Sequence, residues 1–449
     1  MDEAILLKYD RRVPRYTSYP TAPHFDAAVG AREYRRWLER LDPAITLSLY
    51  IHVPFCSSLC WFCGCQTTVV KRYRPVAAYL DLLAAEIDMV ADVLRPRRRV
   101  AHVHWGGGTP TILKGDDLLD VMARLRRRFD LAADAEVAVE VDPRSFDPGL
   151  AAALAAAGVD RASLGIQDFD AKVQMAVNRR QSFDVTKRGV ESLRANGIDA
   201  INFDLMYGLP HQTVPGIVAT VDQALELAPD RIALFGYAHV PWMRRHQRLI
   251  DESALPGARL RLALYRAAGR RLAERGYVAI GLDHFARPAD PLAEAQGSGR
   301  LRRNFEGYTT DDAGALIGFG ASAIATLPQG YAQNAAKVPE YRKAIEAGDF
   351  ATVRGIGIDD EDRLRRDVIG RLMCDLGVDV AEVCRRYDQP PDHFAPELAR
   401  LAAMGADGLL TVDGNRVLIR EHARPIVRTV CAAFDRYLQQ DEVRHSAAL

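Results

Sequence analysis

The stretch TLSLYIHVPFCSSLCWFCGCQ, residues 46–66, joins a run of strand-forming residues to a loop that carries four cysteines. Residues 46–53 are rich in Leu, Ile, Val and Tyr, as in a buried strand. Cys56, Cys60, Cys63 and Cys65 follow at once, while the other three cysteines are scattered over the rest of the chain. A strand that runs directly into a thiol-rich loop predicts a site at the carboxyl end of that strand.

Further strands of the same kind follow, each separated from the next by a helix-length segment with apolar residues at three- and four-residue intervals. We expect them at residues 100–108, 135–143, 161–169, 200–210 and 231–240. Parallel strands that are apolar on both faces have this character, so the six βα units predict an α/β fold, a (β/α)6 part-barrel. We divide the chain into an N-terminal extension over the barrel mouth (1–45), the barrel domain (46–345) and a mainly helical C-terminal domain (346–449).

The overall composition argues against several classes of protein. The 449 residues include 59 Lys and Arg and 59 Asp and Glu, so no global positive field favours nucleic acid. No run approaches the roughly 20 apolar residues of a membrane span, and the opening MDEAILLKYDRR lacks the pattern of a signal peptide. We therefore expect a cytoplasmic protein that binds neither nucleic acid nor a membrane.

The C-x3-C-x2-C-x-C spacing of the cysteine loop limits what the thiols can hold. A disulfide is poorly placed in a reducing cytosol, and a zinc ribbon needs a second ligand pair that the chain does not offer at a suitable spacing. Three thiolates on a four-iron cluster would leave one iron open to another ligand. The spacing therefore favours an iron–sulfur cluster over zinc.

The C-x3-C-x2-C part, with Phe62 just before the last cysteine, resembles the motif of the radical S-adenosylmethionine (SAM) superfamily. HWGGGTPT, residues 104–111, resembles the glycine motif of the same superfamily. Without side chains, the backbone there can approach a ligand closely. The resemblance implies that Cys56, Cys60 and Cys63 hold a [4Fe-4S] cluster whose open iron binds S-adenosyl-L-methionine.

Motifs spread from about residue 8 to residue 440 resemble one family within this superfamily, the oxygen-independent coproporphyrinogen III oxidases, or coproporphyrinogen dehydrogenases. They are PRYTSYPTAPHF, CGC, EVDPR, LGIQDF, VNR, FDLMYGLP, YAHVP, GLDHFARP and GYTT. Such enzymes use a 5'-deoxyadenosyl radical to convert the ring A and B propionates of coproporphyrinogen III to vinyl groups, giving protoporphyrinogen IX in heme biosynthesis. The resemblance implies that coproporphyrinogen III is the substrate. It also implies a low-potential electron donor, which the sequence does not identify. We expect a monomer.

The resemblance also implies two molecules of SAM. Contacts to the cluster-bound molecule match Tyr50, Gly107, Glu140 and Ile324. Contacts to the second match Phe62, Gly108, Thr109, Gln167, Arg179, Asp204 and Ala238. Each polar residue also has a simpler interpretation, for example Glu140 and Asp204 as helix caps or Arg179 as a surface charge. Cys65 is not expected to ligate the cluster; beside the second molecule it would be a polarizable filler or, alternatively, a catalytic support.

The four propionates of the substrate call for cationic and hydrogen-bonding side chains. We expect them to be Arg15, Tyr16, Ser18, Tyr19, His239 and Arg287. Residues 242–248 are further candidates, but they fit an exposed amphipathic helix at least as well. Glu306 stands where we expect Gln in relatives. A carboxylate facing a propionate is unfavourable unless it is protonated or turned away, so a direct substrate contact there is in doubt.

Three other functions compete with the oxidase: a heme-trafficking paralogue, an anaerobic heme-degrading relative, and a zinc-stabilised interaction protein. The trafficking paralogue usually lacks YTSYP, the fourth cysteine of CGC and the arginine of VNR. This chain has all three. The sequence therefore favours the oxidase.

Overall fold

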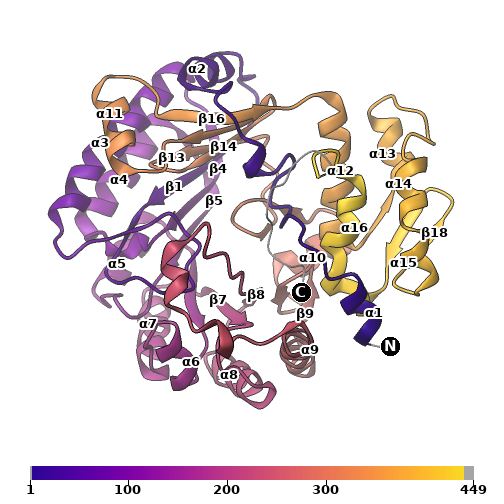
Figure 1. The fold of residues 1–449 in the computed structure, drawn as a ribbon. Coiled ribbons are helices and arrows are strands. Elements are labelled where there is room, and N and C mark those ends of the chain that lie inside the picture. The colour runs from indigo at the N-terminus through magenta and orange to yellow at the C-terminus, as the bar shows by residue number, and fades with distance from the viewer. Residues whose placement is uncertain (1–2, 439–449) are drawn as a thin grey trace.

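The computed structural model describes residues 3–438, and its centre is a curved sheet of twelve strands (Figure 1). Six neighbouring parallel strands form the wall of a part-barrel. They are β1 (Leu47–Val53), β4 (Arg99–Gly107), β5 (Asp130–Val141), β6 (Arg161–Gln167), β7 (Ala200–Tyr207) and β8 (Arg231–Gly236). They lie side by side in chain order, which confirms the predicted (β/α)6 part-barrel.

Further strands extend both edges of this wall. Beyond β1 lie β13 (Ala315–Phe319), β14 (Ile324–Leu327), β15 (Gly330–Asn334) and β16 (Thr352–Gly357); beyond β8 lie β10 (His284–Ala286) and β9 (Val278–Ile280). Within residues 3–438 no pairing joins β16 to β9, so the sheet stays open. Because β16 pairs with β15, the large sheet extends past residue 345 to Gly357.

Helices between the strands cover the outer face of the sheet (Figure 1). They are α3 (Arg74–Val93), α4 (Gly115–Arg128), α5 (Leu150–Ala157), α6 (Ala171–Ala176), α7 (Phe183–Ala195), α8 (Val214–Glu226) and α9 (Ala258–Glu274). In β6, Ala162, Leu164 and Ile166 are buried in this layer, and the alternate residues face the barrel interior. The same alternation in β7 turns Asn202 and Asp204 inward. The inner face is therefore polar, unlike the strands apolar on both faces that we expected.

The segment after β16 is mainly helical. Its elements are α12 (Asp360–Asp375), α13 (Val380–Arg386), α14 (Ala395–Arg400), α15 (Ala402–Ala406), α16 (Val427–Cys431) and a small sheet of β17 (Gly377–Asp379), β19 (Arg416–Ile419) and β18 (Leu410–Asp413). Between β10 and β13 the chain also forms α10 (Pro291–Gly297), β11 (Arg302–Arg303) and β12 (Tyr308–Thr309), and between β15 and β16 it forms α11 (Val338–Glu346), which packs against α3. None of the helices described is long and apolar enough to cross a membrane.

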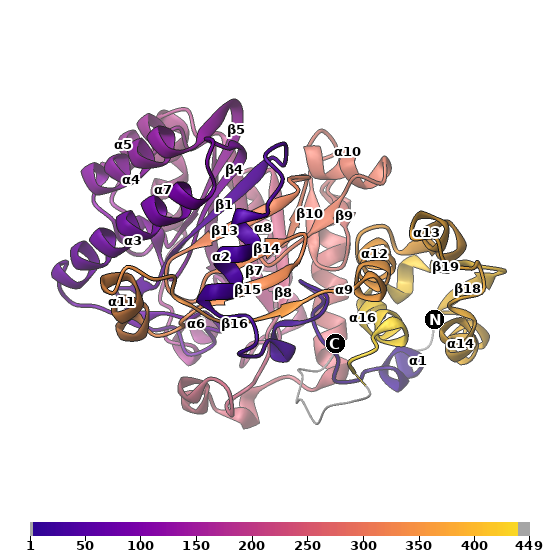
Figure 2. The same ribbon diagram turned by 90° about the horizontal axis from the view of Figure 1, so that it is seen from above.

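The N-terminal segment runs from the C-terminal helices to the barrel (Figure 2). It begins with α1 (Glu3–Lys8), and its Leu6, Tyr9, Tyr16 and Tyr19 are buried in the same apolar cluster as the C-terminal helices. Further along, α2 (Ala31–Glu39) packs against α3 and β16. Residues 3–39 thus contact both the C-terminal helices and the barrel.

Candidate active site

The cysteine loop leaves the barrel wall at the carboxyl end of β1. A short parallel pair, β2 (Phe55–Cys56) and β3 (Thr68–Val69), closes the base of the loop. Cys60 is buried, Cys56 and Cys63 are half-buried, and Cys65 is exposed. The loop therefore lies where parallel-barrel enzymes place their chemistry.

One cavity lies between this loop and the ends of the neighbouring strands, and we call it the cysteine cavity. The predicted site residues that line it are Cys56, Cys60, Phe62, Cys63, Cys65, Gly107, Gly108, Thr109, Glu140, Gln167, Arg179 and Asp204. Its remaining walls are Ser58, Leu59, Thr67, Val141, Asp142, Arg144, Ser163 and Gly165. The structure thus brings most of the predicted cofactor residues together from the cysteine loop, the four strands β4, β5, β6 and β7, and the segments that follow strands.

Hydrogen-bond donors point at the sulfur atoms of the loop. Thr67 and Thr109 donate their hydroxyls to Cys56 Sγ at 3.1 and 3.3 Å, and Arg144 Nη2 lies 3.2 Å from Cys60 Sγ. The backbone N–H of Cys65 donates to Cys63 Sγ at 3.3 Å. Donors of this kind stabilise thiolate sulfur and tune the potential of iron–sulfur clusters.

The spacing of the ligands also bears on what they hold. In residues 3–438, no three Cys, His, Asp or Glu side chains converge closely enough to hold a single metal ion. In a four-iron cluster each thiolate binds a different iron, so the ligands stand farther apart than around one tetrahedral zinc. Three free thiols on one cavity wall are a donor set that an iron–sulfur cluster takes.

The glycine segment at the end of β4 is packed against the cysteine loop. Gly107 has φ +113°, and a Cβ there would lie 2.7 Å from the His52 ring. A Cβ on Gly108 would lie 2.5 Å from Thr67 Oγ1 and 2.6 Å from the carbonyl oxygen of Phe55. Only glycine permits this approach, which brings the backbone to the edge of the cavity without side chains in the way.

Charged groups form the floor of the cavity. Gly107 N–H donates to Glu140 Oε2 at 3.1 Å, and Asp204 accepts from Ser163 and Asn202. Burial, reinforced by the nearby Glu140, raises the pKa of Asp204 to about 7. Arg179 is 6% exposed and donates to the carbonyl oxygen of Gly165 at 2.5 Å, so it is a fixed buried cation and not a surface charge.

A histidine beneath the floor links two carboxylates. His104 Nε2 lies 3.5 Å from Glu140 Oε1, and His104 Nδ1 lies 3.5 Å from Glu306 Oε2. Burial opposes protonation, but the two carboxylates outweigh it and raise the pKa of His104 to about 9. Glu306, whose pKa is raised by burial, is thus paired with a cation of the protein.

Three predicted cofactor residues lie outside the lining of the cysteine cavity. Tyr50 stacks on His104, with the ring centres 5.9 Å apart, behind the floor. Ala238 lies after β8; its carbonyl oxygen and that of Phe62 accept from the same Gln247 amide at 3.2 and 3.0 Å. Ile324, in β14, packs beside an apolar cluster of Phe25, Tyr331 and Ile358.

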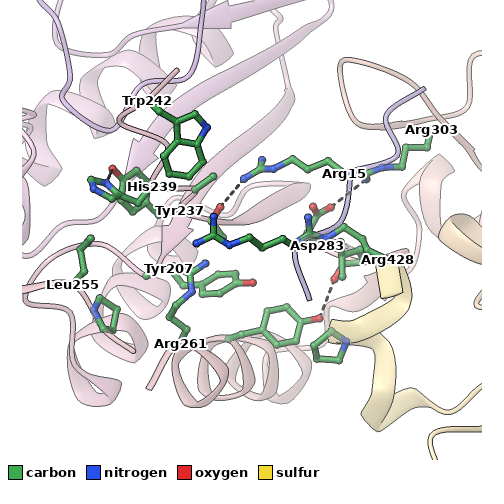
Figure 3. Close-up of a pocket in the computed structure, with 18 residues that line it drawn as sticks. Arg15, Tyr207, Tyr237, His239, Trp242, Leu255, Arg261, Asp283, Arg303 and Arg428 are labelled. Atoms are coloured by element: carbon green, nitrogen blue, oxygen red, sulfur yellow. Dashed lines mark hydrogen bonds and ion pairs between the residues drawn. The ribbon is translucent and has the colours of Figure 1, made fainter. Parts of the chain in front are cut away.

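A second cavity, the arginine cavity, opens beside the first at the carboxyl ends of β7 and β8, with a volume of about 230 Å3 (Figure 3). Two predicted substrate residues line it. Arg15 donates to the carbonyl oxygen of Gly236 at 2.9 Å, and His239 lies between Tyr237 OH at 2.8 Å and Glu252 Oε1 at 2.9 Å. Its other polar walls include Arg12, Tyr207, Trp242, Arg261, Tyr265, Asp283, Arg303 and Arg428.

The electrostatics of the arginine cavity are dominated by guanidinium groups. Burial and the neighbouring Arg15 lower the pKa of Arg428 to about 10. Burial opposes ionisation of Asp283, but Arg303 and His284 hold its pKa well below the usual range. The cavity is therefore strongly cationic at neutral pH.

The remaining predicted substrate residues lie elsewhere. Tyr16 OH donates to Asp435, Tyr19 OH accepts from the backbone of Arg436, and Ser18 donates to the carbonyl oxygen of Pro20. These residues line a different hollow, between the N-terminal segment and α12. Tyr16 and Tyr19 therefore dock the N-terminal segment onto the C-terminal region.

Arg287 lies at the opposite end of the barrel from the cysteine loop. It follows β10, whose antiparallel pairing places it beside the start of β8, and it donates to the carbonyl oxygens of Pro229 and Ala228 at 3.1 Å. The motif that contains Arg287 suggested a substrate contact, but the direction of β10 carries the residue away from both cavities.

Several residues that line the two cavities or lie just behind them were missed in the sequence. Arg144 and His104 stand inside the motifs EVDPR and HWGGGTPT, so their placement could have drawn attention. By contrast, Arg261, Arg303 and Arg428 come from α9, β11 and α16, and no local pattern connects them. Only the packing of the C-terminal region onto the barrel brings these three together.

Comparison with known proteins agrees with this geometry. Residues 50–224 match the radical SAM superfamily, and residues 358–426 match the HemN C-terminal domain. The oxygen-independent coproporphyrinogen III oxidase of Bradyrhizobium diazoefficiens is 48% identical over 98% of each chain, and that of Escherichia coli is 40% identical over 98% of this chain and 96% of its own. The solved structure of coproporphyrinogen III oxidase (HemN) from Escherichia coli, described as a radical SAM enzyme, is similar with a TM-score of 0.90 and 38% identity, over 95% of this chain and 100% of the other. The chain with this cysteine cavity therefore belongs to the oxygen-independent coproporphyrinogen III oxidases of the radical SAM superfamily.

Proposed function

We propose that this protein catalyses the anaerobic oxidative decarboxylation of the ring A and B propionates of coproporphyrinogen III, giving the two vinyl groups of protoporphyrinogen IX. The observation that carries the proposal is the cysteine cavity, where Cys56, Cys60 and Cys63 lie beside Gly107 and Glu140. This arrangement occurs in a chain that matches coproporphyrinogen III oxidases over nearly its whole length.

The three thiolates would hold a [4Fe-4S] cluster, with SAM at the open iron. When bound and reduced, the cluster would supply the electron that cleaves SAM, the radical so formed would take a hydrogen atom from a substrate propionate, and loss of CO2 would then leave one electron for an external acceptor. The protein's own groups bind and orient: the Glu140 carboxylate suits the methionyl ammonium, and Gly107 and Gly108, without side chains, let the methionyl end come close to the backbone. Tyr50 and Ile324 would border this molecule, as the family resemblance implies.

A second SAM molecule would lie against Phe62, Gly108, Thr109, Gln167, Arg179, Asp204 and Ala238, with Cys65 beside it. Two of these residues offer unused polar atoms, since Gln167 Oε1 and Arg179 Nε are buried without a hydrogen-bond partner among the described residues. The cysteine cavity measures about 160 Å3, less than the roughly 300 Å3 of a small-ligand site, so we expect its walls to move outward when both molecules bind.

The stoichiometry of SAM binding tests the second site. By anaerobic equilibrium dialysis, the cluster-loaded protein should bind two molecules and Arg179→Gln one, because the variant loses a buried cation. Glu226→Gln, on an exposed position of α8, is the matched control. One molecule bound by the unaltered protein would remove the two-cofactor proposal and leave the cluster assignment intact.

The substrate would approach from the arginine cavity, where Arg15 and His239 meet it, and the N-terminal extension and C-terminal domain would close the barrel mouth. The proposal includes a monomer in the cytoplasm and an external low-potential electron donor. Anaerobic turnover with reductant, SAM and coproporphyrinogen III, followed by chromatography of the oxidised porphyrins, tests the reaction. Binding or breakdown of heme without formation of vinyl product would favour a heme-trafficking or heme-degrading paralogue.

A further inference from the structure

We infer that the arginine cavity is a carboxylate-binding site that grips the propionates of the substrate that do not react, and that Arg428 of the C-terminal region is one of its anchors. The inference rests on the proposed function, because it names where that substrate is held. It also assigns a task to a part of the chain that lies outside the barrel.

The charge balance of the cavity favours an anion. Among the described residues that line it are five guanidinium groups, those of Arg12, Arg15, Arg261, Arg303 and Arg428, and a single carboxylate, Asp283. Asp283 already faces Arg303 at 3.4 Å and His284 at 2.8 Å. Like charges brought together in a partly buried space repel one another, so carboxylates that enter it relieve an existing cost.

The geometry is suited to carboxylates in particular. Figure 3 shows Arg15, Arg261 and Arg428 pointing toward one another from three separate segments. Planar guanidinium groups bind carboxylates with paired hydrogen bonds, so converging arginines can hold two carboxylates at fixed positions. The reaction leaves two propionates unchanged, which is the number that needs holding while the others react.

The walls of the cavity suit the rest of such a ligand. Tyr207, Tyr237, Trp242 and Tyr265 supply aromatic surface, and Leu255, Pro256 and Leu282 supply apolar contacts. Flat aromatic walls with charges beyond them match an apolar macrocycle edged with carboxylates. At about 230 Å3 the space is smaller than a site that encloses a whole drug-sized ligand, and it fits one carboxylate-bearing edge of the substrate.

The position of the cavity leaves the opposite edge of the macrocycle near the cysteine loop. The segment after β8 borders both cavities: Ala238 and His239 line the arginine cavity, while Gln247 Nε2 donates to Phe62 O at 3.0 Å and His246 Nε2 lies 2.7 Å from Cys63 O. A macrocycle held by its non-reacting propionates would therefore extend toward the site of radical formation.

Binding of coproporphyrin III to the cluster-loaded protein tests the inference, because this oxidised porphyrin is fluorescent and keeps all four propionates. Measured by fluorescence titration under anaerobic conditions, Arg428→Gln and Arg15→Gln should each raise the Kd at least about tenfold, since each loses a charge-assisted contact. Arg428→Lys should recover part of the affinity. Arg275→Gln, at a half-exposed arginine bonded to Asp222, should bind like the unaltered protein.

The tetramethyl ester of coproporphyrin III is the matched ligand, because it has the same ring without the charges. We expect the ester to bind the unaltered protein at least about tenfold more weakly than the acid does. The affinity of the ester should be the same for the unaltered protein and for the variants. Unchanged affinity for the acid in both glutamine variants, or equal affinity of the unaltered protein for ester and acid, would overturn the inference. Should Arg428→Gln fail to fold, Arg15→Gln and the ester comparison still decide. The proposed function is tested apart, because it fails only if the unaltered protein forms no vinyl product.

Discussion

The residues of the cysteine loop have different tasks although they are only a few positions apart. Replacing Cys56, Cys60 or Cys63 by Ser should remove most of the iron and the visible absorption, because a hard hydroxyl is a poor substitute for thiolate on iron. Cys65→Ser should keep both. Iron and sulfide analysis of the anaerobically purified variants measures this, and equal loss of iron from all four would contradict the assignment of three ligands.

His104 and the two carboxylates beside it, Glu140 and Glu306, which we call the His104 array, make the stability of the protein depend on pH. The pKa of His104 is raised from 6.5 to about 9, so its contribution is fully present below pH 6.5 and is lost as pH rises through about 9. Glu306→Gln removes one of the two carboxylates, so the His104 pKa should fall and the loss should begin at lower pH. Chemical denaturation at a series of pH values, with NMR titration of the imidazole, measures both effects.

An exposed glutamate provides the control for that comparison. Glu226→Gln changes the same charge at the end of α8, away from the array, and should leave the pH profile unaltered. If Glu306→Gln and the unaltered protein showed the same imidazole titration, the carboxylate at 3.5 Å would not be acting on His104.

Among the elements, the N-terminal segment has the clearest structural role. Leu6 of α1 is fully buried in the apolar cluster of the C-terminal helices. Leu6→Ala should lower the free energy of unfolding by about 2–5 kcal/mol, since it leaves a cavity there. Denaturant melts measure the change. Leu249→Ala, whose side chain is more than half exposed in the described structure, should change it by less than about 0.5 kcal/mol.

That role also decides how the segment should be studied. Removing the first 25 residues would strip Leu6, Tyr9, Tyr16 and Tyr19 from the C-terminal cluster, so lost activity could reflect unfolding. A single replacement at Arg15, which is exposed and not part of that cluster, tests substrate contact without this complication.

The sequence allowed the wall of the barrel to be predicted because each strand has a local pattern. Short runs rich in Leu, Ile, Val and aromatic residues identify β1 or β7 without knowledge of their neighbours. The polar inner face was missed because residues such as Ser163 and Asn202 are interspersed with apolar ones that dominate the pattern. Arg428 was missed for another reason, since its place depends on how the C-terminal region packs against the barrel.

At the scale of the whole molecule, a ligand bound in the arginine cavity would contact three parts of the chain at once and favour their packing against one another. Arg15, Arg261 and Arg428 belong to the N-terminal segment, the barrel and the C-terminal region. A ligand that bridges them should stabilise the assembled form, by about 2.7 kcal/mol at one hundred times Kd. Hydrogen exchange with saturating coproporphyrin III should show slower exchange around residues 9–19 and 427–437.

The helix α5, which does not border the arginine cavity, serves as an internal reference for that experiment. Amide exchange in α5 should slow only by the amount that the ligand stabilises the whole protein against unfolding. Protection confined to the cysteine loop, with none near residues 427–437, would contradict the coupling.

The joining of the two ends of the chain also sets an order of events during synthesis. Tyr9 O accepts from Thr429, Tyr16 donates to Asp435, and Arg436 donates to Tyr19, across sequence separations of 420, 419 and 417 residues. At translation rates of about 5–20 residues per second, the first of these partners waits roughly 20–80 s for the second to leave the ribosome. The barrel and its cysteine loop emerge in that interval, so a nascent chain can present the thiols before the wall that carries Arg428 exists.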